Sequence, residues 1–309
     1  LTIKEMRRFL STLAFCAALN ANAQDFEVDG FYYNITSLEN LTVALTWNED
    51  GEDYLGNPNG FGTYSGDIVV PRSVDWNGRT FVVNEIQGEA FVGCTLSSLV
   101  VPETVDYMYI GGARITDLVI EDGQDLLHAS KDYQEDPNEG DEYGMIGDCE
   151  IENLYLGRNT PSRTVSTGIR KVTFGQNVTE VSDYMFSTCG ITGLLILPEH
   201  IRRIGNYAFA RNENLTGVQA PGVESMGMCA FKDCGSLADI QMPSLRYIGP
   251  AAFKDCVSLT AFEIPKGASG VGACAFEGCT ALEAVTIPNS MIHFGKDVYL
   301  NTIFVIRSI

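Results

Sequence analysis

Hydrophobic positions recur along most of this chain with a period of 22 or 23 residues. Each unit has an Ile-Gly pair, an Ala-Phe pair, a leucine, and then an alternation of apolar and other residues that ends in proline. The copies 248–265 and 271–288 agree at nearly all of these positions. The aromatic markers of the period are Phe186, Phe209, Phe231, Phe253, Phe276 and Tyr299. Self-similarity at a fixed period of this length predicts a repeat architecture in which each unit stacks on the next.

The pattern L-x-x-I-x-I-P within each unit predicts a short β-strand, because its last residues alternate between inward and outward directions. Such a strand is not stable alone, but stacked copies form a parallel sheet with about 4.8 Å between neighbours. Proline ends the strand because it has no N–H to donate. The Ile-Gly and Ala-Phe part is expected to turn the chain back, with glycine allowing a tight bend and phenylalanine filling the opposite wall. The nine expected strands end near Val101, Ile120, Leu156, Phe174, Leu197, Ala220, Met242, Ile264 and Ile287.

At the pattern I-G-x-x-A-F-x-x-C-x-x-L-x-x-I-x-I-P the chain resembles the BspA-like leucine-rich repeat family of bacterial surface proteins. The resemblance covers about residues 25–300 and is carried best by 248–265 and 271–288. It implies an α/β repeat fold rich in β-structure: a right-handed leucine-rich-repeat solenoid with a parallel sheet and an N-terminal β-hairpin cap. It also implies an exported protein, since members of this family are exported and some are credited with adhesion to host proteins.

The first residues have the character of a secretory signal. Arg7 and Arg8 precede a mostly apolar stretch of eleven residues, which an Ala-Asn-Ala cleavage site follows. We expect residues 1–23 to be a signal peptide with an upstream extension, cleaved near Ala23, and the protein to be exported to the cell surface or beyond. A buried first helix and lipid attachment at Cys16 are the alternatives. The mature chain has no stretch of the ~18 apolar residues that a transmembrane helix requires.

Residues 24–84 are expected to form a β cap, because a solenoid needs covered ends. Asp29-Gly30 and Asn77-Gly78 separate alternating stretches and are two-residue turns of the kind preferred in β-hairpins. Residues 85–309 then form the leucine-rich-repeat solenoid, which an acidic insert at about 121–150 interrupts.

The insert breaks the period and holds eleven carboxylates, with Lys131 as its one cation. We expect a solvated loop that bulges from one coil. A calcium site is the alternative, although the segment 136–141 lacks the glycine and the closing glutamate at the spacing of an EF-hand loop.

The overall charge argues against one class of function. Asp and Glu outnumber Lys and Arg by 40 to 20, and the net charge of −20 repels phosphate backbones, so nucleic-acid binding is not expected. The three histidines, His128, His200 and His293, stand in unrelated contexts, and no Ser/His/Asp or Cys/His set converges in sequence. We therefore expect no enzyme, and no catalytic residue, cofactor or metal site.

Several cysteines share one slot of the repeat, three residues after the phenylalanine. They are Cys94, Cys189, Cys234, Cys256 and Cys279. Because this slot faces the interior, cysteine is expected to act there as a small hydrophobic residue. Cys229 and Cys274 share a second slot but lie two coils apart, about 9–10 Å, which is too far for a disulfide. We predict buried free thiols.

The outward residue of each strand, between two buried neighbours, forms a row along the sheet face. The first half of the row is apolar or aromatic and the second half is polar. The residues expected to contact a ligand are Val100, Val119, Tyr155, Thr173, Ile196 and Gln219. An exposed apolar row with polar neighbours often marks an interaction site. Ordinary β-propensity, or cover by the cap or the insert, would explain the row equally well.

These patterns favour a non-catalytic, exported or cell-surface binding protein whose ligand is a protein or a glycan, as in adhesion. A rigid repeat array loses little conformational entropy on binding, which suits this use. The alternative is a structural spacer of the envelope without a specific ligand. The spacer hypothesis predicts that Tyr155→Asp and Ile196→Asp leave every binding measurement unchanged.

Overall fold

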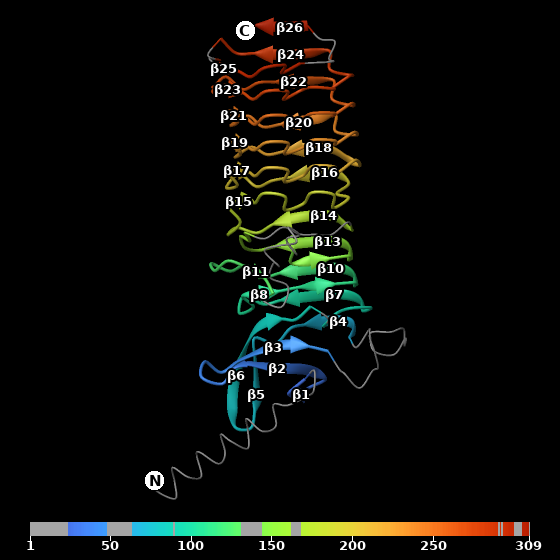
Figure 1. Cartoon of the computed structure of the whole chain (residues 1–309), viewed down its shortest axis with the longest axis vertical. Coiled ribbons are helices and arrows are strands. Elements are labelled where there is room, and N and C mark those ends of the chain that lie inside the picture. Colours follow the sequence, from blue (N-terminus) through green and yellow to red (C-terminus); the bar gives the residue numbers. More distant parts are fainter. Residues whose placement is uncertain are drawn as a thin grey trace, which may run out of the picture.

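The chain winds into a tall stack of coils, with β1 at one end and β26 at the other (Figure 1). The structure is a computed structural model that describes residues 24–47, 64–88, 90–130, 144–161, 168–289, 291, 293–299 and 305–308. The regular elements of these residues are β-strands. The β-rich solenoid with parallel sheets that the repeat period predicts is confirmed. No helix in this described part is long and apolar enough to cross a membrane, and the expected signal peptide, 1–23, lies outside it.

Two hairpins lie at the beginning of the stack, as the turn signals predict. The first joins β1 (Phe26–Val28) to β2 (Phe31–Ser37), and the second joins β5 (Ser73–Trp76) to β6 (Arg79–Ile86). Both turn residues of each hairpin have positive φ, which the Asp-Gly and Asn-Gly pairs tolerate. Between the hairpins, β3 (Thr42–Thr46) pairs antiparallel with β2 and parallel with β6. This segment thus changes from antiparallel hairpins to the parallel stack.

The main wall of the solenoid contains each of the nine strands predicted from the repeat. Its first sheet has the order β14-β13-β10-β7-β4, with every pair parallel. These strands are β4 (Ser65–Val69), β7 (Thr95–Val101), β10 (Arg114–Ile120), β13 (Glu150–Leu156) and β14 (Ile169–Phe174). The wall continues with β16 (Gly193–Ile196), β18 (Leu215–Gln219), β20 (Asp239–Gln241), β22 (Ala261–Glu263), β24 (Ala284–Ile287) and β26 (Val305–Ser308). The pattern did not predict β4, so this wall starts one strand earlier than expected.

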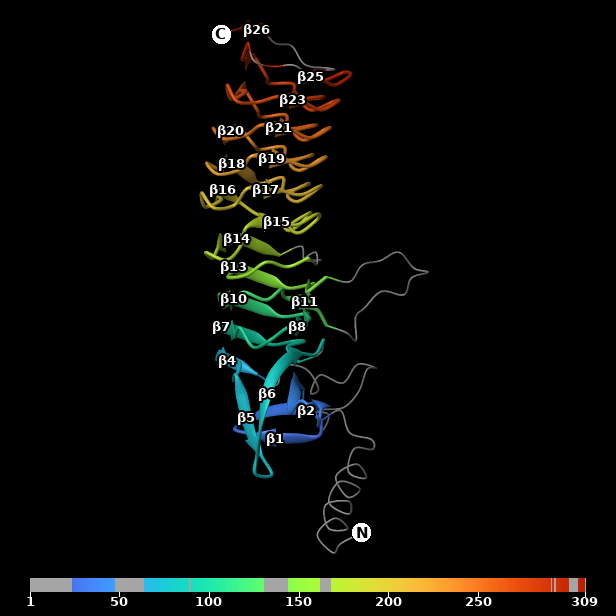
Figure 2. The ribbon, with the colours of Figure 1, turned by 90° about the vertical axis from the view of Figure 1, so that its left-hand side faces the viewer.

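A second wall of two-residue strands lies across the core from the first (Figure 2). Its later strands are β15 (Glu180–Val181), β17 (Arg203–Ile204), β19 (Ser225–Met226), β21 (Tyr247–Ile248), β23 (Gly270–Val271) and β25 (His293–Phe294). Its earlier strands are β8 (Tyr107–Met108), β9 (Ile110–Gly111), β11 (His128–Ala129) and β12 (Ile146–Gly147). From β14 onward each coil contributes one strand to each wall, whereas the coils of β7 and β10 each contribute two short strands to the second wall.

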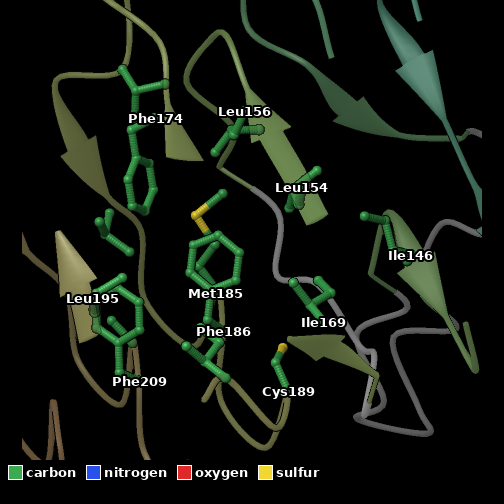
Figure 3. Close-up of a cluster of buried hydrophobic side chains, with 14 of the residues drawn as sticks. Ile146, Leu154, Leu156, Ile169, Phe174, Met185, Phe186, Cys189, Leu195 and Phe209 are labelled. Atoms are coloured by element: carbon green, nitrogen blue, oxygen red, sulfur yellow. The ribbon is translucent and has the colours of Figure 1, made fainter. Parts of the chain in front are cut away.

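The repeat phenylalanines form a continuous column inside the stack. Successive ring centroids from Phe186 through Phe209, Phe231, Phe253 and Phe276 lie 5.2–5.8 Å apart, with interplanar angles of 11–17°. Tyr299 extends the column at 5.7 Å from Phe276. Figure 3 shows the beginning of this core, where Phe186 and Phe209 lie among aliphatic residues of both walls. The predicted stacking of aromatic rings, one per coil, is confirmed.

The fold requires the glycine of the Ile-Gly pair for a reason that differs from the expected tight bend. It is not a left-handed turn residue, since positive φ falls on non-glycine residues such as Tyr207 and Cys229, at 53° and 54°. Hydrogen bonds between coils hold these residues, for example from the N–H of Tyr207 to the carbonyl of Met228. A Cβ on Gly249 would instead overlap the backbone of Gly227 in the coil before it. Close approach of neighbouring coils therefore excludes a side chain at this position.

The eight described cysteines are free, and seven of them are buried. In three neighbouring coils the thiol lies 3.0–3.2 Å from a phenylalanine carbonyl: Cys234 to Phe209, Cys256 to Phe231 and Cys279 to Phe253. In the same slot Asn212 donates to the carbonyls of Phe186 and Phe209 at 2.8 Å. Small side chains thus fill the slot and donate hydrogen bonds to backbone carbonyls of the preceding coil. The prediction of free buried thiols is confirmed for the seven buried cysteines.

Within the predicted acidic insert, the segment between β11 and β12 takes the place of a single residue of the second wall. β11 pairs with β8 and β12 pairs with β9, so the segment between β11 and β12 stands where the preceding coil has Tyr109 alone. The segment 131–143, with the proposed calcium ligands, lies outside the described residues. The strands on either side of 131–143, β11 and β12, belong to the second wall, whereas Glu121, Asp122 and Glu150 of the predicted insert lie at main-wall strands.

Candidate functional site

The predicted outward row is aligned on the first sheet by strand pairing. Val119 is the register partner of both Val100 and Tyr155, and Thr173 is the next partner along the sheet. Val69 of β4, which the sequence pattern missed, extends the row by one strand and is 61% exposed. Val100, Val119 and Tyr155 are half-buried and Thr173 is exposed. The sheet therefore brings four of the six predicted residues side by side.

The other two predicted residues lie on the next sheet. Ile196 of β16 is paired with Gln219 of β18, and Gln241 follows. No strand pairing joins β14 to β16 among the described residues, so the row crosses a discontinuity between Thr173 and Ile196. Beside this break Ile196 is 55% exposed and its neighbour Leu194 is 50% exposed. Two large aliphatic side chains thus face solvent where the sheet is interrupted.

Polar side chains beside the row are bonded across the strands. The hydroxyl of Ser98 donates to Asp67 at 2.9 Å, and the amide of Asn153 donates to Asp117 at 2.8 Å. The Tyr155 hydroxyl donates to Asp122 at 2.9 Å. These bonds fix the direction of the side chains, and they place a carboxylate next to the aromatic member of the row.

An acidic ledge follows the row at the carboxyl ends of the same strands. We define the ledge as Glu103, Glu121, Asp122 and Asp125. Arg72 bridges two of its members, at 2.8 Å to Glu103 and 2.7 Å to Glu121. Hydrogen bonding to Arg72 lowers the pKa of Glu103 to about 2. Burial, followed by the contact with Glu103, raises the pKa of Glu121.

A second arginine lies beneath this ledge. Arg158 is fully buried, and its guanidinium donates to the backbone carbonyls of Pro102, Glu103 and Val105 in a coil two levels away. Its stem passes Gly123 of the intervening coil, where a Cβ would lie 3.0 Å from Arg158 Cδ. Burial lowers the pKa of this guanidinium, and the nearby Asp106 and Glu103 oppose the shift. Arg158 thus fastens three coils together.

A polar hollow of about 680 Å³ lies at the start of the same strands. Two exposed ion pairs are part of its lining, Arg114 with Glu150 at 3.0 Å and Arg170 with Glu152 at 3.2 Å. Its uncharged polar lining residues are Thr95, Thr116, Thr192 and Asn214. Such a lining offers donors and acceptors to a hydroxyl-rich ligand.

Two histidines and a buried thiol of the described residues have defined local surroundings. His200 bonds the carbonyl of Gly175 at 3.0 Å, and His128 stacks on Tyr107. Burial raises the pKa of the Cys234 thiol to about 12, so it is protonated at neutral pH. No group of three metal-ligating side chains occurs in the part of the chain that the structure describes.

Sequence reasoning missed the ledge, the buried Arg158 and the hollow. The ledge had a sequence signal, because a carboxylate follows each of β7 and β10 within two residues. Arg158 had a weaker signal, since it stands two residues after a strand where the neighbouring coils have Asp122 and Gln176. The hollow had none, because its lining comes from several coils.

Comparison with known proteins assigns the repeat type. Residues 164–244 match the family model described as BspA type leucine rich repeat region, in six copies. The resemblance noted from the sequence is thereby confirmed. No curated protein matches the chain.

Several solved structures are similar to this chain over most of its length. A leucine-rich repeat protein from Bacteroides ovatus is 17% identical, with 90% of this chain and 92% of that chain covered and a TM-score of 0.37. The pneumococcal vaccine antigen PcpA is 16% identical, with 92% and 87% covered and a TM-score of 0.38. A leucine rich repeat protein of T. pallidum is 20% identical, with 87% and 85% covered and a TM-score of 0.31.

Proposed function

Because the chain carries BspA-type leucine-rich repeats, we propose that it is a non-catalytic binding protein. It acts outside the cell or at its surface, with a protein or a glycan as its ligand, as in adhesion. Residues 1–23 serve as its export signal. The ligand lies along the outward row of the main wall.

The observation that carries this proposal is the register of the outward row. Five adjacent parallel strands, β4 to β14, present Val69, Val100, Val119, Tyr155 and Thr173 side by side. A contiguous apolar row on a rigid sheet, rimmed by polar side chains, has the anatomy of a protein interface. The strands β11 and β12, on either side of 131–143, pair on the other wall, which supports a ligand site on this face.

The test is a binding screen of the chain against immobilised extracellular-matrix proteins and a glycan array. Hits are then measured again with Ile196→Asp, which places a charge in the row at an exposed position where the fold does not depend on it. The matched control is Tyr247→Asp on β21, which is 44% exposed on the second wall.

We expect Ile196→Asp to weaken binding at least tenfold, about 1.4 kcal/mol, and Tyr247→Asp to leave it unchanged. The absence of any ligand at micromolar concentration would favour the structural spacer. Equal losses in both variants would place the ligand elsewhere on the molecule.

A further inference from the structure

The outward row and the acidic ledge are parts of one surface. The ledge begins within three residues of Val100 and of Val119 along their strands, and the Tyr155 hydroxyl bonds Asp122 directly. Any segment long enough to cover the row from β7 to β13 therefore also comes to the ledge. The chemistry of the ledge then limits what that segment can be.

The ledge carries more negative charge than its arginines neutralise. Four carboxylates face two guanidinium groups, Arg72 at the surface and Arg158 beneath it, so two negative charges remain. Glu103, Asp122 and Asp125 are exposed. An anionic or purely apolar partner would meet like charges or remove carboxylates from water without compensation, and both are costly.

Arg72 is shared in a way that leaves one glutamate under-neutralised. Its Nε and Nη2 both donate to the carboxylate of Glu103, and Nη2 also donates to Glu121. The pKa of Glu121 is raised, first by burial and next by its contact with Glu103. A further cation beside Glu121 would oppose this upward shift, since it stabilises the ionised carboxylate.

The second half of the main wall lacks this combination. Its outward residues are Gln219, Gln241, Glu263 and Thr286, and the two residues that follow each of these strands include a proline and no carboxylate. The half of the face that combines apolar side chains with excess negative charge is thus the half from β4 to β13.

We propose that this surface binds a cationic polypeptide segment in which lysine or arginine side chains alternate with aliphatic or aromatic ones. This proposal rests on the proposed function and adds the chemistry of the partner. The aliphatic side chains contact the row, and the cations lie over the ledge. Three strand spacings of about 4.8 Å give a row of about 14 Å, which about four extended residues would span.

The experiment measures the binding of three labelled ten-residue peptides to the chain by fluorescence anisotropy. The peptides alternate Lys with Val, Glu with Val, and Lys with Ser. We expect the Lys-Val peptide to bind, with an affinity that falls about tenfold between 20 and 200 mM salt because the charge pairs are screened. We expect the Lys-Ser peptide to bind at least fivefold more weakly and the Glu-Val peptide not to bind. Equal affinity of the Lys-Ser and Lys-Val peptides, or binding of the Glu-Val peptide, would overturn the proposal.

Two variants with opposite expected effects on affinity distinguish binding at the ledge from general attraction of a cationic peptide to an acidic protein. Glu103→Gln with Glu121→Gln should lower the affinity for the Lys-Val peptide at least fivefold, whereas Arg72→Gln should raise it about threefold. The matched control is Glu180→Gln with Glu224→Gln, which removes two ion-paired glutamates from the second wall and should change nothing. A loss in the control equal to that in the ledge variant would contradict the proposal.

These outcomes also distinguish the two proposals from each other. A ligand from the screen that Ile196→Asp weakens, but that Glu103→Gln with Glu121→Gln does not, would leave the binding function standing and reject the cationic partner. A glycan ligand sensitive to Arg170→Gln in the hollow would likewise reject it.

Discussion

The coils between residues 180 and 299 repeat one set of contacts at every level, whereas the coils between residues 64 and 175 differ from one another. In the later coils a phenylalanine column, a glycine column and a column of small polar side chains each continue without interruption. The earlier coils instead contain the buried Arg158, the surface Arg72 that is shared between two glutamates, and the insert. The regular coils hold the shape, and the irregular coils carry the surface with distinctive chemistry.

This difference follows from what a repeat can do. A contact repeated at every level stabilises the stack but presents the same chemistry along its whole length. A specific partner requires a surface that differs from its neighbours, and such a surface arises where coils depart from the pattern. The outward row is apolar from Val69 to Tyr155 in the irregular part and polar from Gln219 onward in the regular part, which agrees with this division.

The largest expected effect tests the regular coils. Gly249→Ala should destabilise the protein by about 3 kcal/mol, because the new Cβ would overlap the backbone of Gly227. Gly267→Ala is the matched control, since a Cβ there meets nothing within 4 Å, and its effect should stay within about 0.5 kcal/mol. Urea unfolding followed by circular dichroism measures both. Equal effects would mean that neighbouring coils do not approach as closely as the glycine column requires.

The next effect tests the irregular coils. Arg158→Met removes three hydrogen bonds to backbone carbonyls, two of them buried, and should cost about 2 kcal/mol, because those carbonyls lose their partner. Gln176→Met is the control at the equivalent, exposed position of the next coil and should be neutral. Unfolding by urea provides the measurement. A neutral Arg158→Met would show that this arginine is not needed to join the coils.

The smallest effect compares the thiols of the two regions. Burial raises the pKa of Cys149 to about 11 in the irregular part and that of Cys234 to about 12 in the regular part. Above pH 9 the unfolded thiols ionise before the folded ones, so stability should fall as the pH rises from 9 to 11. Cys234→Ala should make this fall shallower than in the unchanged protein, measured as the urea midpoint against pH. Identical slopes would contradict a buried, protonated thiol.

Much of the main wall could be predicted from sequence, because the contacts that form it join equivalent positions one period apart. Phe231 packs on Phe209 and Phe253 for this reason, and the outward positions of Val119 and Tyr155 follow from the same alternation. The outward row of the candidate site could be predicted because its members also occupy equivalent positions of successive repeats. The role of the Ile-Gly glycine was misjudged, since the clash that excludes a side chain is with another coil and is not local.

The sequence by itself determined the period, the strands of the main wall, the aromatic column and the slot of the free thiols. The tertiary structure alone decided that β4 joins the sheet, that Arg158 fastens coils 53–56 residues away, and that Arg72 brings Glu103 and Glu121 together. Repeated contacts recur at a fixed spacing and can be read along the chain. Unique contacts join positions that no spacing relates, and the folding of the coils is what brings them within reach.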